Sequence, residues 1–156
     1  MKICVFSDSH GYAGNMTAVI GLEQPDMCFF LGDGARDIEM VMKRHPDLPV
    51  YAVRGNCDFS SDLSNSIVRT IAGVTIYAAH GHMDNVKYDS ALDTLTARAL
   101  EAGADVALFG HTHRQHLSRN LGVLLINPGS IGRSYYPSYA VLNVNNGFCD
   151  ADLKTI

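Results

Sequence analysis

The sequence is short of positive charge. It has 12 Lys and Arg residues against 16 Asp and Glu residues, which gives a formal net charge of −4. Sequence-independent binding along a nucleic-acid backbone relies on a basic surface, so we expect no non-specific nucleic-acid binding. A phosphate substrate remains compatible with this composition, because bound metal ions can supply positive potential locally.

Long apolar runs and paired cysteine motifs are also lacking. No apolar run reaches the roughly 18 residues of a membrane span, and no charged leader precedes a long apolar segment, so we expect no membrane association. The four cysteines are widely spaced and form no CxxC pair. This spacing is typical of a reducing compartment, so we expect a cytoplasmic protein.

The remaining composition is that of a globular protein. Hydrophobic residues make up 47% of the 156 residues and charged residues 18%, with no low-complexity segment or internal repeat. A chain of this length usually forms one domain with a substantial core. We therefore expect a single domain over residues 1–156.

The first third of the chain alternates between strand and helix patterns. Short apolar runs predict strands at residues 2–6, 26–31 and 50–53, and apolar side chains at helical spacing predict helices at residues 15–23 and 36–44. Strands that are apolar on both faces and separated by helices are typical of a parallel sheet buried between helical layers.

The middle of the chain contains a hairpin pattern and the clearest helix. Strand patterns at residues 66–71 and 74–79 flank Ala72-Gly73, which predicts a two-residue turn. A helix is predicted at residues 89–102, with Ser90 and Asp93 as a capping box. Its predicted apolar stripe consists of Leu92, Leu95, Ala99 and Leu100.

The last third contains strand patterns and turns. The strands are predicted at residues 105–109, 123–126, 139–144 and 148–153. We expect His116 to lie in a polar turn, and Arg114 and Arg119 to lie on a solvated face. The fold class is therefore predicted to be mixed α/β, with two sheets packed face to face and helices outside.

Side chains that can bind metal follow five of the predicted strands. They are Asp8 and His10, Asp33, Asn56 and Asp58, His80 and His82, and His111 and His113. Ligand sites of open α/β sheets lie beyond the carboxyl ends of the strands, so these side chains should converge. Taken singly, most of these residues fit ordinary turns, but turn chemistry does not explain the joint arrangement.

This mixture of ligands suits particular metals. Carboxylate oxygens with neutral imidazoles favour borderline divalent ions such as Mn²⁺, Fe²⁺ or Zn²⁺, and enough ligands exist for two ions. Two ions about 3.5 to 4 Å apart, bridged by a carboxylate and a hydroxide, would hold a phosphoester and present the hydroxide for in-line attack on phosphorus.

The same residues resemble the motifs of the calcineurin-like metallophosphoesterases. The matching blocks are Asp8-x-His10, Gly32-Asp33, Gly55-Asn56-x-Asp58, Gly81 flanked by His80 and His82, and Gly110-His111-Thr112-His113. The stretch Asn127-Pro128-Gly129-Ser130 extends the resemblance to the small branch that includes YfcE-like phosphodiesterases. The resemblance implies a four-layer α-β-β-α sandwich and a dinuclear-metal phosphodiesterase acting on a small phosphoester substrate.

The resemblance also implies roles for individual residues. Asp8, His10 and His113 would bind the first metal ion, and Asn56, His80 and His111 the second, with the Asp33 carboxylate bridging both. The amide of Asn56 could also meet the phosphate. We expect Mn²⁺, with Fe²⁺, Zn²⁺ and Ni²⁺ as alternatives.

Cys57 departs from the wider superfamily pattern, in which many members have histidine at this position. That histidine is usually assigned to phosphate binding or to protonation of the leaving group, whereas the YfcE-like branch also has cysteine. Cys57 is therefore either a replacement acid or a bystander, and His82 is a second candidate for phosphate contact or proton donation.

Other functions stay open from the sequence. A Vps29-like protein-interaction scaffold would share the fold, and a phosphomonoesterase or nucleotide phosphatase would share the metal pair. Tyr135 and Tyr136 are expected to pack on the domain or on a second subunit, or else to stack on an aromatic substrate. The physiological substrate, the metal used in the cell and formation of a homo-oligomer are not fixed by the sequence.

Overall fold

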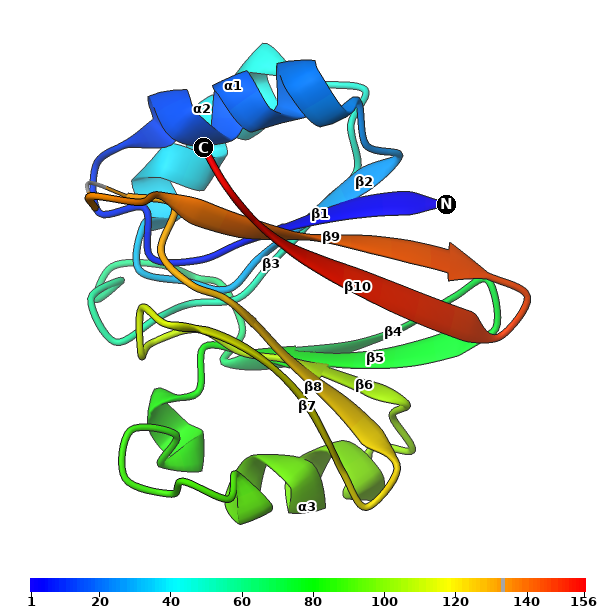
Figure 1. Cartoon of the computed structure of the whole chain (residues 1–156). Coiled ribbons are helices and arrows are strands. Elements are labelled where there is room, and N and C mark those ends of the chain that lie inside the picture. Colours follow the sequence, from blue (N-terminus) through cyan, green and yellow to red (C-terminus); the bar gives the residue numbers. More distant parts are fainter. Residues whose placement is uncertain (133) are drawn as a thin grey trace.

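The structure is a computed structural model that describes residues 1–132 and 134–156. Two five-stranded sheets lie face to face (Figure 1). The strand order of the first sheet is β10 (Phe148–Thr155), β9 (Ser138–Asn145), β1 (Lys2–Phe6), β2 (Met27–Phe30) and β3 (Val50–Ala52). The order of the second is β4 (Ser66–Ile71), β5 (Val74–Ala79), β6 (Val106–Leu108), β8 (Val123–Pro128) and β7 (Gln115–Asn120).

Helices cover the outer faces of both sheets. Helices α1 (Ala13–Glu23) and α2 (Ala35–Arg44) lie on the first sheet, and α3 (Asp93–Glu101) lies on the second (Figure 1). A 3-10 turn, η1 (His82–Asp84), follows β5. The predicted four-layer α-β-β-α sandwich is confirmed.

Alternation along the strands creates the layers. In β1, Ile3 and Val5 belong to the core between the sheets, whereas Cys4 and Phe6 belong to the core beneath α1 and α2. A third apolar cluster joins α3 to the outer face of the second sheet. Side chains alternate across a strand, so a strand that is apolar throughout is buried on both faces.

The parallel strands bring their carboxyl ends to one edge of the sandwich. Strands β1, β2 and β3 run parallel to one another in the first sheet, as do β5, β6 and β8 in the second. The loops that follow these strands gather at one edge of the molecule, at the left of Figure 1. Side chains far apart in the sequence therefore meet at that edge.

Helix α3 is shorter than predicted, and its capping box is wrong. Leu92 has a left-handed backbone and a buried side chain, so the helix begins only at Asp93. The Asp89 carboxylate, rather than the Ser90 side chain, accepts a hydrogen bond from the Thr94 N–H. Leu92, Leu95 and Ala99 are buried as predicted, but Leu100 is exposed.

Strand β7 replaces the predicted polar turn around His116. Its residues are exposed or half-buried because it is an edge strand, paired only with β8 among the described residues. A strand without an apolar face has no alternating hydrophobic pattern to reveal it. The predicted hairpin turn at Ala72-Gly73 is confirmed, with Ile71 paired to Val74.

Two further features concern the surface. Tyr135 and Tyr136 are exposed, which contradicts packing on the domain. Within residues 1–132 and 134–156, no helix is long and apolar enough to cross a membrane.

Candidate metal centre

The loops at the carboxyl ends hold the candidate ligands in an uncommon backbone conformation. Five of them have positive φ angles: Asp8 (56°), His10 (43°), Asp33 (60°), His111 (67°) and His113 (58°). Left-handed backbone is uncommon for residues other than glycine, and such residues cluster at functional sites. These loops therefore hold the candidate ligands in a conformation that backbone preference alone does not favour.

Asp8 is a fully buried carboxylate with two different oxygens. Its Oδ2 accepts hydrogen bonds from the Ser7 hydroxyl at 2.6 Å and from the His111 N–H at 3.1 Å. Its Oδ1 is buried and accepts no hydrogen bond in the part of the chain that the structure describes. A buried polar atom without a hydrogen bond is unfavourable, so this oxygen is a candidate ligand for a cation.

Three imidazoles surround that oxygen. The Nε2 atoms of His113, His10 and His80 lie 3.1, 3.8 and 3.9 Å from Asp8 Oδ1. The Nε2 atoms of His10 and His113 lie 3.4 Å from each other. Two imidazoles that aim their Nε2 atoms at one carboxylate oxygen are suitably placed to share a metal ion with it.

Asp33 lies between the two halves of the site. Its Oδ1 accepts a hydrogen bond from the Cys57 N–H at 2.8 Å, while its Oδ2 lies 3.5 Å from His80 Nε2 and 3.9 Å from His10 Nε2. Burial alone would raise the pKa of this carboxyl, but the hydrogen bonds from His80 and Cys57 outweigh burial and lower it. Asp33 is therefore ionised at neutral pH and faces both histidines.

His80 is oriented by a backbone hydrogen bond. Its Nδ1 lies 2.6 Å from the Leu31 carbonyl oxygen, which can only accept, so Nδ1 carries the proton. This leaves Nε2 facing the site, 3.1 Å from Asn56 Oδ1. Burial lowers the pKa of His80, whereas the Asp33 carboxylate and the charge of Asp8 raise it. The upward effects outweigh burial, so the pKa of His80 is raised overall.

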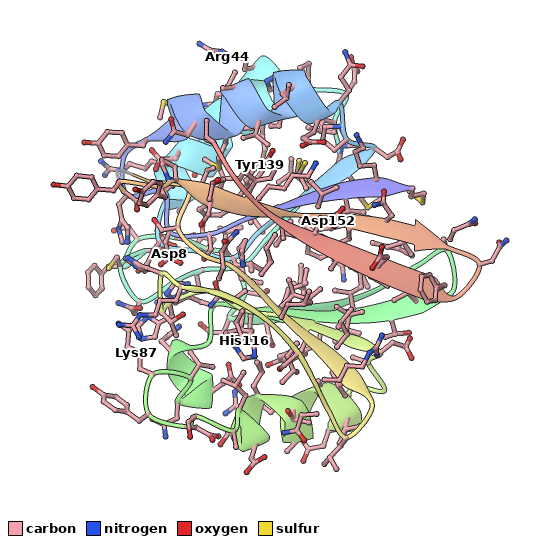
Figure 2. All side chains as sticks on the ribbon, viewed as in Figure 1. Asp8, Arg44, Lys87, His116, Tyr139 and Asp152 are labelled. Carbon is pink, nitrogen blue, oxygen red and sulfur yellow. The ribbon has the colours of Figure 1, made fainter. Side chains whose placement is uncertain are left out.

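His111 and His113 have opposite pKa shifts. Burial and the neighbouring His80 lower the pKa of His111 to about 4, so its imidazole is neutral at neutral pH. The adjacent Asp8 carboxylate, whose Oδ1 lies 3.1 Å from Nε2, raises the pKa of His113 despite partial burial. The charge of Lys87 lowers the pKa of both, and Figure 2 shows Lys87 at the same edge of the molecule as Asp8.

The side chains form overlapping groups with the spacing of metal ligands. Asp8, His10 and His113 present ligand atoms within 4.8 Å of one another, and so do Asp33, His80 and His111. The structure thus brings together the residues that the sequence assigned to each ion, with Asn56 beside His80. The mixture of carboxylate, amide and imidazole donors fits borderline divalent ions. Their role as ligands stays a prediction.

Cys57 and His82 lie at the rim of this centre. Cys57 is exposed, and its thiol forms a third group within 4.8 Å with His10 and Asp33. Burial and the Asp33 carboxylate raise the pKa of Cys57 to about 11. The ring of His82 lies 5.4 Å from that of His80. Burial is the largest cause of the lowered pKa of His82, and the charge of His80 is the second. At neutral pH the thiol is therefore protonated and His82 is neutral.

Asp58 supports the centre and is not free to bind metal. Its Oδ2 accepts hydrogen bonds from the Asp33 and Gly55 N–H groups, both at 2.8 Å. Its Oδ1 accepts from the Gly34 and Ala35 N–H groups, both at 2.9 Å. With four backbone donors the carboxylate is saturated, so its inclusion among the metal-capable side chains is corrected. It fastens the loop after β2 to the loop after β3.

Asn127 and Ser130 support the other side of the site. The Asn127 side-chain amide donates to the Gly110 carbonyl at 2.9 Å and to the Thr112 hydroxyl at 3.1 Å, which holds the loop that carries His111 and His113. The Ser130 hydroxyl donates to the Asp8 carbonyl at 2.8 Å. The sequence resemblance included these residues without a role, and the structure shows that they position the ligand loops.

Close backbone packing explains two of the glycines in the motifs. A Cβ atom on Gly55 would collide with Asp33 Oδ1, and one on Gly110 would collide with the Ser7 hydroxyl. Both glycines let a ligand-bearing loop approach its neighbour more closely than any side chain would allow.

Comparison with known proteins identifies the family. Residues 1–147 match the calcineurin-like phosphoesterase superfamily domain. The chain is 35% identical over 150 residues to the probable metallophosphoesterase YsnB of Bacillus subtilis, covering 94% of this chain and 86% of that protein. It is also 29% identical over 153 residues to a probable metallophosphoesterase of Mycoplasma pneumoniae, covering 94% of this chain and 91% of that protein.

Solved structures show the same fold. A predicted phosphoesterase of Streptococcus pneumoniae superimposes with a TM-score of 0.82 at 26% identity, covering 99% of this chain and 88% of that one. Vps29 of Entamoeba histolytica, in a structure with bound zinc, superimposes with a TM-score of 0.78 at 20% identity, covering 99% of both chains. The latter likeness is one of fold alone. Sequence and structure together show that the chain belongs to the calcineurin-like phosphoesterase superfamily.

Proposed function

We propose that this protein is a metal-dependent phosphodiesterase with a centre for two divalent ions. One observation carries the proposal: Asp8 Oδ1 is buried, accepts no hydrogen bond from the described residues and faces three imidazole Nε2 atoms. A cation bound beside such a carboxylate would stabilise it. Membership of the family supports metal-dependent phosphoester hydrolysis as the reaction.

The residues divide into two ligand groups. Asp8, His10 and His113 would hold one ion, Asn56, His80 and His111 the other, and the Asp33 carboxylate would contact both. Bound ions would lower the pKa of water and neutralise charge on the phosphate oxygens. The chain's own contribution is to fix these ligands through the Leu31 carbonyl on His80 and the Asp58 carboxylate on the Asp33 loop.

One cavity that includes candidate ligands, and a second that reaches the loop of His111 and His113, leave room for the two arms of a diester. One, of about 560 Å³, is lined by His10, Asp33 and Cys57, and the other, of about 550 Å³, is lined by Thr112 between the two histidines of its loop. A diester has two organic arms that need space on either side of phosphorus. A monoester would need space on only one side.

The rim of the centre offers only weak acids to the leaving group. The Cys57 thiol is protonated at neutral pH, but with its pKa raised to about 11 it is a weak proton donor. The pKa of His82 is lowered, so His82 is neutral and carries no extra proton to donate. We therefore propose that the enzyme prefers esters whose leaving group needs little protonation, such as aryl esters. A rate that does not depend on leaving-group pKa would contradict this preference.

The metal and the compartment belong to the same proposal. Imidazole and carboxylate donors accept Mn²⁺, Fe²⁺, Ni²⁺ and Zn²⁺, with intrinsic affinity higher for Zn²⁺ than for Mn²⁺. We propose Mn²⁺ as the activating ion, on grounds of cellular availability. The four cysteines are free thiols, which fits activity in the reducing cytoplasm.

The deciding experiment compares two substrates. Chelated protein is restored with Mn²⁺ and given a bis-aryl phosphodiester and the matching aryl monoester, with Asp33→Asn as the control. We expect turnover of the diester that requires metal and disappears in the variant. Preferential turnover of the monoester would instead indicate a phosphomonoesterase.

Absence of turnover would change the proposal. Absence of hydrolysis of either ester with Mn²⁺, Fe²⁺, Ni²⁺ or Zn²⁺, although metal binds, would favour a Vps29-like interaction scaffold and a search for a protein partner. Asn56→Ala provides a second test within the enzyme. We expect it to lower turnover more than it lowers the free energy of unfolding, and an unchanged rate would remove Asn56 from the site.

A further inference from the structure

Exposed aromatic side chains are concentrated at the edge that carries the metal centre. Among residues 1–132 and 134–156, the exposed Phe and Tyr side chains are Tyr12, Phe59, Tyr88, Tyr135, Tyr136 and Phe148. The first five lie in loops that follow β1, β3, β5 and β8, whereas Phe148 begins β10 beside the turn that contacts Gly73. Transfer of an aromatic ring from water to an apolar contact is favourable, so the concentration of exposed rings at one edge indicates a binding surface.

One of these rings lies in a cavity that includes candidate ligands. This cavity of about 560 Å³, here called the Phe59 cleft, is lined by His10, Asp33, Cys57, Arg36, Glu39 and Phe59. His10, Asp33 and Cys57 belong to the candidate site. The second cavity, of about 550 Å³, contains none of the seven candidate ligands. A group attached to a phosphate at the centre therefore has direct space in the Phe59 cleft.

The lining of the Phe59 cleft combines the Phe59 ring with charged and hydroxyl side chains. Phe59 is 85% exposed, so a face of its ring is open to a ligand. Arg36 and Glu39 lie on the first turns of α2, are exposed, and have no ion pair or side-chain hydrogen bond within residues 1–132 and 134–156. Ser60 adds a hydroxyl to the lining. An open ring beside a cation, a carboxylate and a hydroxyl suits a planar heterocycle attached to a hydroxylated linker.

We infer that the Phe59 cleft binds a nucleoside arm of the phosphodiester substrate. This inference rests on the proposed phosphodiesterase function and names its substrate class. The base stacks on Phe59, and the sugar hydroxyls lie within the polar part of the lining formed by Glu39 and Ser60. Arg36 lies on the same wall and offers a donor to the base or to the phosphate. Stacking on one aromatic side chain tolerates any base, so the cleft selects nucleosides over alkyl groups without selecting among bases.

The test uses two diesters that share a leaving group. Thymidine 5′-(p-nitrophenyl) phosphate and methyl p-nitrophenyl phosphate both release p-nitrophenol and differ only in the arm that is retained. The values of kcat/KM for both are measured with Mn²⁺ for the wild type, Phe59→Ala, Phe59→Leu and Phe148→Ala. Phe59→Leu keeps an apolar side chain without an aromatic face, and Phe148→Ala removes an exposed ring at the opposite end of the sandwich.

We expect the wild type to prefer the nucleoside ester and Phe59→Ala to lower this preference about 5- to 100-fold, through KM. Phe59→Leu should recover only part of the preference, and Phe148→Ala should leave both rates unchanged. A wild type without preference, or an equal loss on both esters in Phe59→Ala, would overturn the inference. The latter result would mean that the ring contacts the nitrophenyl group instead.

A binding measurement separates this inference from the proposed function. Calorimetric titration of Mn²⁺-loaded protein with thymidine 5′-monophosphate and with methyl phosphate does not depend on turnover. We expect tighter binding of the nucleotide, and loss of that difference in Phe59→Ala. Failure of both diesters to react would remove the phosphodiesterase proposal. Equal affinity for the two phosphates, or a difference that survives Phe59→Ala, would overturn the nucleoside site.

Discussion

Two buried carboxylates of this protein have opposite surroundings. Glu23, at the end of α1, accepts hydrogen bonds from Lys154 at 2.8 Å, from the Tyr139 hydroxyl at 2.9 Å and from Lys2 at 3.3 Å. Asp8 receives only neutral donors on Oδ2, and its Oδ1 faces imidazoles without a hydrogen bond from the described residues. In Figure 2, Asp8 lies at the edge where the loops gather, whereas Tyr139 lies beneath the helices.

The difference separates a structural charge from a functional one. Burial of a carboxylate is unfavourable by several kcal/mol unless compensating groups surround it. Lysines of the chain provide compensation for Glu23, and four backbone N–H groups provide it for Asp58. For Asp8 and Asp33 the chain provides imidazoles that orient ligand atoms but add no fixed positive charge. The raised pKa values of His80 and His113 show that these imidazoles respond to the carboxylate charge, and we expect bound cations to supply the fixed positive charge.

The strongest test of this contrast removes the charge of Asp33. Asp33→Asn keeps an oxygen for the Cys57 N–H but removes the negative charge between His10 and His80. Loss of a ligand to both ions removes several kcal/mol of transition-state stabilisation, so we expect turnover of an aryl diester to fall about 10³-fold or more. Steady-state kinetics with added Mn²⁺ measures this effect. Retention of half the activity would rule out a bridging role.

Addition of metal should stabilise the folded protein. At a free Mn²⁺ concentration 100 times the Kd, mass action contributes about 2.7 kcal/mol, which raises Tm by about 5 to 10 °C in a domain of this size. Thermal unfolding of chelated protein, with and without Mn²⁺, gives the shift. It should shrink in Asp33→Asn and persist in Glu23→Gln, and an equal shift in both variants would show that Mn²⁺ binds elsewhere.

Weakening of the support beneath the ligands should have an intermediate effect. Asp58→Asn replaces one acceptor oxygen by an NH₂ group that faces backbone donors. We expect metal affinity or turnover to fall about 10- to 100-fold, because the loops that carry Asp33 and Asn56 lose their connection. Asp105→Asn is a matched control, since Asp105 also accepts a backbone hydrogen bond, from Thr75 at 2.8 Å, before β6. Equal losses in both variants would indicate a general effect on stability.

The smallest effect is expected at Glu23 and should concern stability alone. The hydrogen bond from Lys154 is the largest cause of the lowered pKa of Glu23. Because the pKa of Glu23 is lower in the folded state, its charge stabilises the fold fully at pH values above the unfolded pKa of about 4.3. This stabilisation is lost as pH falls through the folded-state pKa.

Glu23→Gln should therefore lower the free energy of unfolding by about 1 kcal/mol at pH 7 and by progressively less below pH ~4. Urea unfolding at several pH values measures this difference. A loss that is independent of pH would show that packing, and not charge, accounts for the effect of the substitution. Mn²⁺-dependent turnover should remain.

Local sequence patterns predicted the parallel strands and the ligand loops because both have strong signals. Apolar runs marked β1, β2 and β5, and a carboxylate or imidazole followed each. The same reasoning missed β7, which is stabilised by pairing with β8. It also extended α3 over residues 89–92, where Leu92 has a left-handed backbone and a buried side chain. Propensity within a short window does not contain either of these long-range contacts.

The convergence of the candidate side chains was predictable from the residues, but the pattern alone did not distinguish the carboxylates that could bind metal from the one that supports the loops. Asp8, Asp33 and Asp58 are equivalent in the sequence, since each follows a strand and lies near glycine or histidine. In the structure only Asp58 is surrounded by backbone donors, because the loops after β2 and β3 turn their N–H groups toward it. The direction of those groups is a property of packing between loops.

The sequence by itself determined the order of the strands along the chain, the set of candidate ligands and the resemblance to a family of metallophosphoesterases. The tertiary structure decided which buried carboxylates have their charge compensated within the chain, that Asp8 Oδ1 faces three imidazoles, and that Phe59 opens into the cleft beside them. The physical reason is that residue type and spacing are local properties. Burial, charge compensation and the direction of a lone pair depend on groups that the fold brings from distant parts of the chain.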